Sequence, residues 1–305
     1  KNWQYGKQIG YAVKNILKDR CGEGKYATRA AHEARFKYFT SYLKNEGIND
    51  LKKIDKNIIT RFGHTLKLAV EQNKMSVAYA QNLLSTVNVV LSYGRGDNSL
   101  VVSQANVVGN RSHVRSTAPK SLDRNEVKGA VSKMNDSIAQ VSVQLAREFG
   151  LRFKETALLN LNRAIKEANT LGKFNVQEGT KGGRTAERWV LVSPRQLALL
   201  KEAKLTAGKF KNLVGKSGSF KQWQNRFNAE YLKSGAREQL GKFHDLRAAY
   251  ACERYKELTG KPSPVVSGQR LASYQTDLRA RELISVELGH QRIDVLNSYL
   301  GSAYR

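Results

Sequence analysis

The chain has 305 residues, a length typical of two domains, and 40% of them are hydrophobic, which excludes a wholly disordered protein. It carries 52 Lys and Arg residues against 26 Asp and Glu residues, a formal charge of +26. Such an excess destabilises a compact protein by self-repulsion unless a polyanion neutralises it, so nucleic acid is the leading partner. An anionic membrane surface is the competing interpretation.

Several other classes of protein lack support in the sequence. No apolar run is long enough to span a membrane, and no apolar core of a signal peptide is present, so we expect no spanning helix, and DNA rather than a membrane is the partner we predict. Cys21 and Cys252 form no Cys-x-x-Cys motif, and the five His have no zinc-finger spacing. We therefore expect a reduced cytosolic protein with no structural metal and no cofactor.

The first third of the chain shows the apolar spacing of amphipathic helices. Helices are expected at residues 1–20, 28–45, 55–72 and 77–93. Ser76 is a plausible cap for the fourth helix, and glycines follow the second and fourth. Each Lys or Arg here could be an ordinary solvated side chain, but their collective excess favours a surface that faces DNA. We therefore predict a helical, DNA-binding domain at residues 1–110.

A basic linker is predicted at residues 111–120, which are polar and include Pro119. The second domain then spans residues 121–305, with Ser121 preferred over Asp123 as the first helix cap. Alternating residues at 174–177 and 188–192 predict a β-hairpin with Lys181 near its tip, and the remaining segments indicate helices. The predicted fold class is mainly α with a small β-hairpin (α+β), arranged as a two-domain DNA clamp.

Candidate catalytic residues follow from the needs of metal-free phosphodiester transfer: a nucleophile, cations for the phosphate oxygens and a proton donor for the leaving oxygen. Arg152 stands at a helix start, and Glu155 is three residues later, on the same face. His244 and Arg247 likewise share one helix face. Each has an ordinary alternative role, such as a surface ion pair or a helix cap. The same holds for three further candidates: Lys181 could be one hairpin lysine among many, His290 could lie at a helix junction, and Tyr299 could be a buried structural tyrosine.

The four motifs, taken in order, resemble the catalytic half of the tyrosine recombinase (phage integrase) family. They are Gly150-Leu151-Arg152-Phe153-Lys154-Glu155, Gly179-Thr180-Lys181-Gly182-Gly183-Arg184, His244-Asp245-Leu246-Arg247 and Leu288-Gly289-His290 with Tyr299 nine residues further on. The resemblance covers residues 121–300 with specific motifs and residues 1–100 only loosely. It implies that a clamp of two domains closes on DNA.

The resemblance also implies a role for each matching residue. Arg152 and Arg247 would hold the scissile phosphate, Lys181 would protonate the 5′ oxygen, and His244 would serve in acid–base and phosphate contacts. His290 would hydrogen-bond the phosphate, and Glu155 would support the pocket. Tyr299 would attack the scissile phosphate to give a 3′-phosphotyrosine.

The function implied is a site-specific DNA recombinase that integrates or excises a mobile element. Its partners would be double-stranded DNA with paired recombination sites, the other subunits of a homotetramer and accessory DNA-bending proteins. Chromosome-dimer resolution or DNA inversion by the same chemistry, a type IB topoisomerase, a non-catalytic DNA-binding protein and a metal-dependent nuclease are the alternatives. The interval between Arg247 and His290 is longer than in many relatives, which suggests an insertion near residues 260–276. The hypothesis is that this insertion helps to assemble the tetramer; an ordinary surface loop is the alternative.

Overall fold

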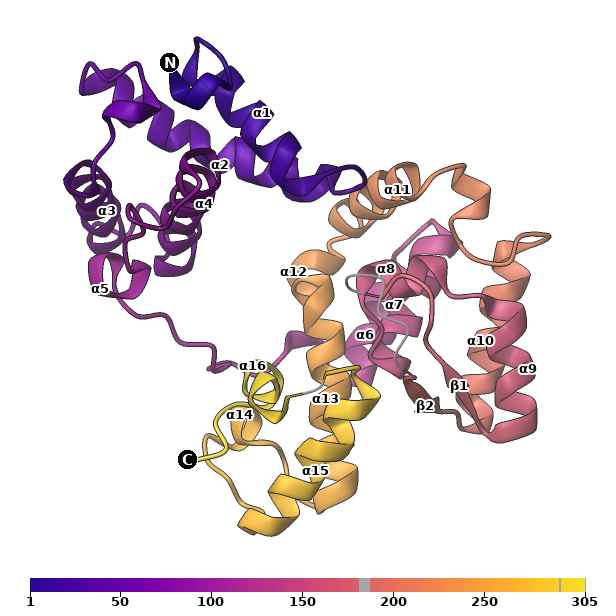
Figure 1. The fold of residues 1–305 in the computed structure, drawn as a ribbon. Coiled ribbons are helices and arrows are strands. Elements are labelled where there is room, and N and C mark those ends of the chain that lie inside the picture. Colours follow the sequence, from indigo (N-terminus) through magenta and orange to yellow (C-terminus); the bar gives the residue numbers. More distant parts are fainter. Residues whose placement is uncertain (181–186, 291, 305) are drawn as a thin grey trace. The chain divides into compact units, whose positions relative to one another are not determined.

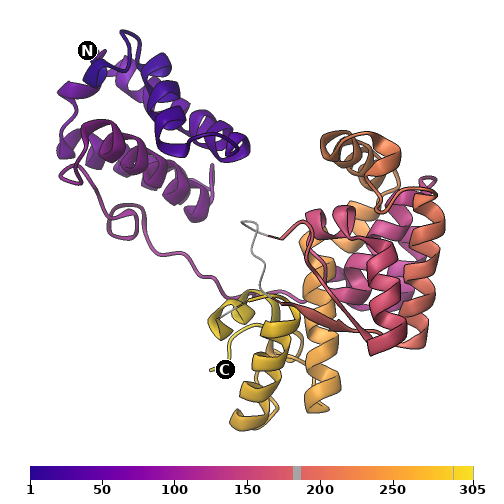
Figure 2. The same ribbon diagram turned by 45° about the vertical axis from the view of Figure 1, so that its right-hand side comes forward.

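The computed structural model describes residues 1–180, 187–290 and 292–304 and divides the chain into two compact units, Lys1–Ser112 and His113–Arg305. Both units are built mainly from helices, and a single two-stranded antiparallel sheet lies among the described residues of the second (Figures 1 and 2). The predicted fold class is confirmed. None of the helices that the structure describes combines the length and the apolarity that a membrane crossing requires.

The first unit is a helical bundle around its own apolar core. Its elements are η1 (Asn2–Gln4), α1 (Ile9–Cys21), α2 (Tyr26–Asn45), η2 (Leu51–Lys53), α3 (Lys56–Glu71), α4 (Val77–Arg95) and α5 (Gln104–Val108). Capping side chains start several of them: Asp55 accepts from the Ile58 N–H and Ser76 from the Tyr79 N–H. The first predicted helix begins only at Ile9, and α5 occupies a stretch that showed no helical signal in the sequence.

The second unit contains the residues that the sequence motifs single out. Its elements are η3 (Lys120–Leu122), α6 (Arg124–Ser132), α7 (Ser137–Phe149), α8 (Phe153–Leu158), α9 (Leu161–Leu171), β1 (Lys173–Asn175), β2 (Trp189–Leu191), α10 (Pro194–Ala207), η5 (Gly215–Ser217), α11 (Phe220–Lys233), α12 (Ala236–Leu240), α13 (Phe243–Thr259), α14 (Pro264–Ser267), α15 (Tyr274–Glu287), η6 (Ile293–Leu296) and α16 (Asn297–Leu300).

Helix α7 is central to this unit, because it packs against α10 on one side and α13 on the other. The strands pair with Phe174 opposite Val190, as the alternating sequence predicted. On the far side of α13 lie α15 and α16, which share a second apolar cluster with it (Figure 1). Helix α13 therefore joins the main core to the C-terminal helices.

Two local expectations differ from the structure, and one short helix was not predicted. Asp123, not Ser121, caps α6, because Asp123 accepts from the Asn125 N–H. The helix expected from Phe153 onward breaks, and α9 restarts after its own cap, Asn160. The proline-rich segment after α13 includes the short helix α14, which is sterically allowed because Pro264 is at the first helical position and needs no hydrogen-bond acceptor there.

Candidate active site

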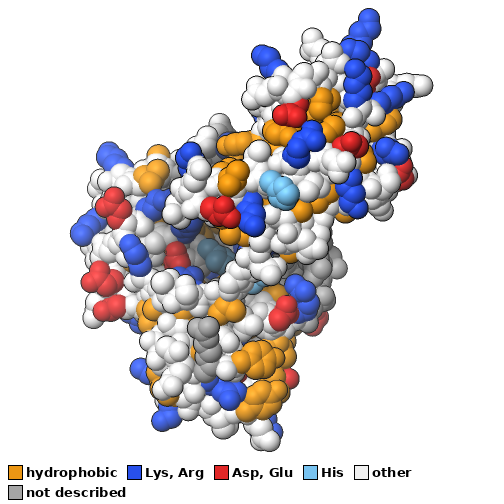
Figure 3. All heavy atoms as spheres, turned by 90° about the vertical axis from the view of Figure 1, so that its left-hand side faces the viewer, with side chains coloured by type: hydrophobic (Ala, Val, Ile, Leu, Met, Phe, Trp, Pro, Cys, Tyr) orange, Lys and Arg blue, Asp and Glu red, His pale blue; other side chains and the backbone are white. Residues whose placement is uncertain are grey.

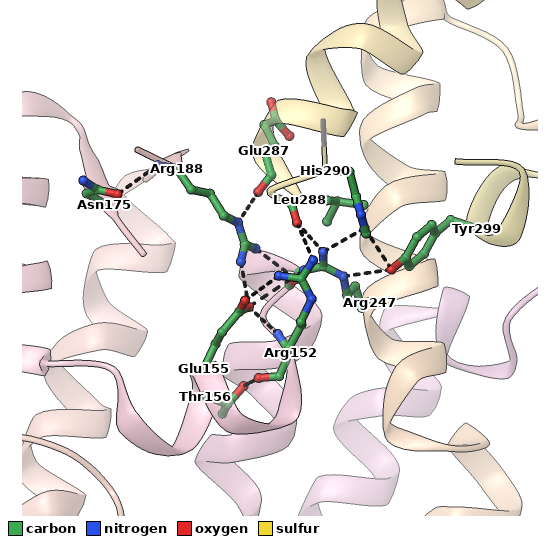
Figure 4. A network of polar contacts seen from close by, with 11 residues as sticks. Arg152, Glu155, Thr156, Asn175, Arg188, Arg247, Glu287, Leu288, His290 and Tyr299 are labelled. Atoms are coloured by element: carbon green, nitrogen blue, oxygen red, sulfur yellow. Dashed lines mark hydrogen bonds and ion pairs between the residues drawn. The ribbon is translucent and has the colours of Figure 1, made fainter. Parts of the chain in front are cut away.

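Tyr299 lies on the one-turn helix α16, and two side chains from other elements converge on its hydroxyl group (Figure 4). The Arg247 Nε donates a hydrogen bond to the Tyr299 oxygen at 3.3 Å, and the His290 Nε2 lies 3.2 Å from that oxygen. The side chain of Tyr299 is only 3% exposed. The fold thus buries a hydroxyl group between a guanidinium and an imidazole.

The tautomer of His290 follows from its neighbours. Its Nε2 also lies 3.3 Å from the Nη2 of Arg247, and a guanidinium can only donate, so Nε2 must accept. The Tyr299 hydroxyl already accepts from Arg247 and can donate its own proton toward the same nitrogen. Burial, reinforced by the charges of Arg247 and Arg152, lowers the pKa of His290 to about 3. The ring is neutral at pH 7 and is placed to take the tyrosine proton.

His244, from the first turn of α13, lies beside the same tyrosine. The centroid of its ring is 5.0 Å from that of Tyr299. Although the residue is exposed, crowding of the ring by protein atoms and the nearby charge of Arg247 lower the pKa of His244 to about 4. It is a second neutral imidazole in the free protein, available to donate or accept a hydrogen bond.

Arg247 is 1% exposed and is held by backbone carbonyls at the ends of two helices. Its guanidinium donates to the carbonyl of Gly150, which follows α7, and to that of Leu288, which follows α15. Carbonyls at a helix C-terminus lack partners within the helix and carry partial negative charge, so they accept from a cation well. Burial lowers the pKa of Arg247 only to about 10, and the group stays charged at pH 7.

Arg152 enters the site from the start of α8 and is the more accessible arginine. Its side chain is 23% exposed; Nη1 donates to the Glu155 Oε1 at 2.6 Å and Nη2 to the Leu288 carbonyl at 3.2 Å. The same carboxylate accepts from the Arg152 backbone N–H at 2.7 Å. Glu155 therefore fixes both the backbone and the side chain of Arg152.

Arg188, which the sequence motifs did not single out, is the third arginine of the site (Figure 4). Its Nη1 donates to the Glu155 Oε2 at 2.6 Å, and its Nε donates to the Glu287 carbonyl at 2.7 Å. Burial alone would raise the pKa of Glu155, but the charges of Arg188, Arg247 and Arg152 outweigh it and lower that pKa. No motif spacing marks Arg188, and the only available signal was its position at the foot of the predicted hairpin.

Lys181 lies outside the described residues, but the described residues on both sides of residues 181–186 contact α8 at or next to Glu155. On one side Arg188 pairs with its carboxylate. On the other, Gly179 packs so closely on α8 that a Cβ atom would lie 2.5 Å from the Lys154 carbonyl oxygen. Its φ of +74° also favours glycine. The described residues Gly179 and Arg188 thus both lie against α8, at Lys154 and Glu155.

The charges of the site favour an anion. Three guanidinium groups, from Arg152, Arg188 and Arg247, share one carboxylate, Glu155, within 4 Å. The two neighbouring imidazoles are neutral. The remaining positive charge can neutralise phosphate oxygens, and Arg152 keeps guanidinium surface exposed to meet them. In residues 1–180, 187–290 and 292–304, no group of three or more His, Cys, Asp or Glu side chains is arranged to hold a metal ion.

The structure therefore brings together Arg152, Glu155, His244, Arg247, His290 and Tyr299, from four separate parts of the second unit. A tyrosine hydroxyl beside a neutral histidine and arginines, in a mainly helical domain with one small hairpin, is the arrangement expected of the class of tyrosine recombinases.

Comparisons with known proteins agree with this class. The family model described as Integrase matches residues 109–253. A lambda integrase dimer bound to a COC′ core site has a TM-score of 0.59 at 14% identity, over 97% of this chain and 77% of that one. A sequence comparison with curated proteins gave no match. Residues 109–253 thus resemble integrases in sequence, and the chain shares the fold of lambda integrase.

Two further structures share the fold. The Tn1549 transposon integrase, in complex with transposon right end DNA, has a TM-score of 0.57 at 12% identity and is matched over 94% of each chain. The XerH site-specific recombinase, bound to a palindromic difH substrate, has a TM-score of 0.57 at 17% identity, over 95% of this chain and 80% of that one. At these identities, the likeness concerns the fold.

Proposed function

We propose that this protein is a site-specific DNA recombinase that cleaves and rejoins DNA through a 3′-phosphotyrosyl bond at Tyr299. The observation that carries the proposal is the convergence of the Arg247 Nε and the His290 Nε2 on the Tyr299 hydroxyl, at 3.3 and 3.2 Å. This arrangement supplies a nucleophile, a proton acceptor and a cation within one buried pocket.

In the proposed reaction, the Tyr299 oxygen attacks the scissile phosphorus while its proton moves to the Nε2 of His290. The bond from phosphorus to the 5′ oxygen breaks as the phosphotyrosyl bond forms. Arg152 and Arg247 neutralise the non-bridging oxygens as negative charge develops in the transition state. We assign Lys181 as the donor of a proton to the leaving 5′ oxygen, and His244 to acid–base and phosphate contacts. The resemblance implied that His290 hydrogen-bonds the phosphate; we assign it the tyrosine proton instead, because its Nε2 lies 3.2 Å from the Tyr299 hydroxyl. Rejoining reverses these steps with a new 5′ hydroxyl.

Both units are proposed to bind duplex DNA as a clamp, the first as a core-binding domain and the second as the catalytic domain. The formal charge of +26 supports this, and Lys and Arg side chains are spread over the face shown in Figure 3. Lambda integrase, which shares the fold, has been solved as a tetramer bound to a Holliday junction. By analogy we propose a homotetramer on paired sites in the bacterial cytosol, with accessory DNA-bending proteins as further partners.

The specific role we propose is integration and excision of a mobile element, because the matching family model is that of integrases. Chromosome-dimer resolution or DNA inversion would use the same residues. Incubating the protein with a library of nicked duplexes, and sequencing the DNA left attached to it, would separate these roles by the target sequence that is recovered.

The nucleophile is tested by Tyr299→Phe, which keeps the ring and removes the hydroxyl. We expect the variant to bind DNA and to form no covalent adduct on nicked duplexes. Tyr304→Phe is the matched control, because Tyr304 is 88% exposed near the end of the described chain. An adduct that persists in Tyr299→Phe and disappears in Tyr304→Phe would refute the assignment.

A further inference from the structure

Tyr299, the proposed nucleophile, belongs to a very short helix. Helix α16 is a single turn, Asn297–Leu300, that follows the 3-10 turn η6 directly, and the Gly301 N–H after it donates to the Asn297 carbonyl at 3.3 Å. One helical turn is unstable alone, because nucleation fixes several backbone dihedrals for very few bonds. The position of the Tyr299 hydroxyl must therefore depend on contacts with other elements.

Arg281 of α15 contacts both ends of this turn. Its Nη1 donates to the Asn297 Oδ1 at 3.1 Å, and its Nη2 donates to the Gly301 carbonyl at 3.2 Å. Arg281 is 1% exposed, so these bonds are shielded from water. One planar guanidinium thus spans the nucleophile helix from its first residue to the residue after its last.

Arg281 is itself rigidly held. Its Nε donates to the Asp277 Oδ2 at 2.8 Å, and the other oxygen of this buried carboxylate accepts from the Tyr255 hydroxyl at 2.7 Å. Tyr255 belongs to α13, the helix that also supplies Arg247. The network therefore ties the nucleophile helix to the helix that carries its arginine partner.

Two backbone contacts complete the enclosure of α16. The Arg115 N–H donates to the Asn297 carbonyl at 2.8 Å. Gly301 has a φ of +83°, and a Cβ atom there would lie 2.7 Å from the backbone nitrogen of Val265 in α14. The proline-rich segment, which the sequence suggested as an insertion for tetramer assembly, thus packs against the nucleophile helix of its own chain.

We propose that Arg281 and Asn297 are positioning residues for Tyr299, which keep its hydroxyl within hydrogen-bonding distance of Arg247 and His290. The inference rests on the proposed role of Tyr299 as nucleophile. Neither residue touches the reacting atoms; they act through the placement of α16. A displacement of about 1 Å can cost about 10²-fold in rate, so loss of one bond in this network should slow cleavage without weakening DNA binding.

The test uses the full chain with Asn297→Ala, which removes the acceptor for Arg281 and leaves the buried Arg281–Asp277 pair intact. At saturating nicked duplex, single-turnover adduct formation should slow about 10-fold or more, while the Kd for DNA stays unchanged. Asn297→Asp keeps an acceptor oxygen at that place and should restore most of the rate. Asn212→Ala is the matched control, because Asn212 also loses one acceptor bond of 3.1 Å, to the Val214 N–H, at a site remote from α16 in sequence.

Hydrogen exchange gives a second readout that does not need activity. The amide of Gly301 should exchange faster in Asn297→Ala than in the wild type or in Asn297→Asp. A wild-type cleavage rate in Asn297→Ala, or equally slow Ala and Asp variants, would overturn the proposal. Failure of the wild-type protein to form any adduct would instead refute the proposed function, and the exchange of Gly301 would still decide whether the network holds α16.

Discussion

The buried ion pair between Arg188 and Glu155 should be among the most costly contacts to remove from the second unit. The two side chains are 4% and 0% exposed and meet at 2.6 Å. Arg188→Met keeps much of the side-chain volume but removes one of the positive charges that stabilise the buried Glu155 carboxylate. It also removes the hydrogen-bond donor to the Glu287 carbonyl. Removing one partner of a buried pair costs about 3–5 kcal/mol.

The magnitude expected here is near the lower end of that range. Arg152 still pairs with Glu155 at 2.6 Å, so the carboxylate is not left alone. We expect the free energy of unfolding to fall by about 3 kcal/mol, equivalent to about 10 °C in Tm for a unit of this size. Because Glu155 also fixes Arg152, the cleavage rate of the folded variant should fall as well.

Urea unfolding, followed by tryptophan fluorescence, measures this loss. The chain has three Trp, and Trp3→Phe as the common background leaves only Trp189 and Trp223, both in the second unit. The control is Arg195→Met, because Arg195 meets Glu148 at the same 2.6 Å but is 59% exposed. An exposed pair contributes less than about 1 kcal/mol. Equal losses in the two variants would refute the reasoning, since burial would then have no effect.

Acid should destabilise the protein partly through His290. Its pKa of about 3 in the folded state lies below the ordinary value, so its contribution is fully present above about pH 6.5 and is lost as the pH falls toward 3. Between pH 6.5 and 5 the free energy of unfolding should fall by an amount on the order of 2 kcal/mol through this group. His290→Gln should therefore flatten the dependence of the free energy of unfolding on pH, measured by urea unfolding. An unchanged pH dependence in this variant would contradict a neutral His290 in the folded protein. Cleavage of nicked duplexes should continue in excess chelator, whereas abolition with rescue by a divalent cation would indicate a metal-dependent nuclease.

The sequence by itself determined the elements and most of the residues that meet at the site. Helical periodicity located most helices of the first unit, and Ser76 was identified as the cap of α4, because these signals are local. The order of the motifs singled out Arg152, Arg247 and Tyr299, because the chemistry limits which residue types can serve. These features depend on residues close in the chain or on residue type alone.

Tertiary structure decided the contacts that hold those residues in place. Arg188 bonds to Glu287 across 99 residues, and nothing in a chain with 52 Lys and Arg distinguishes it beforehand. Arg281 is likewise one arginine among many until the fold buries it between Asp277 and Asn297. Burial turns these ordinary cations into fixed parts of the site, because a charge removed from water must find every partner within the protein.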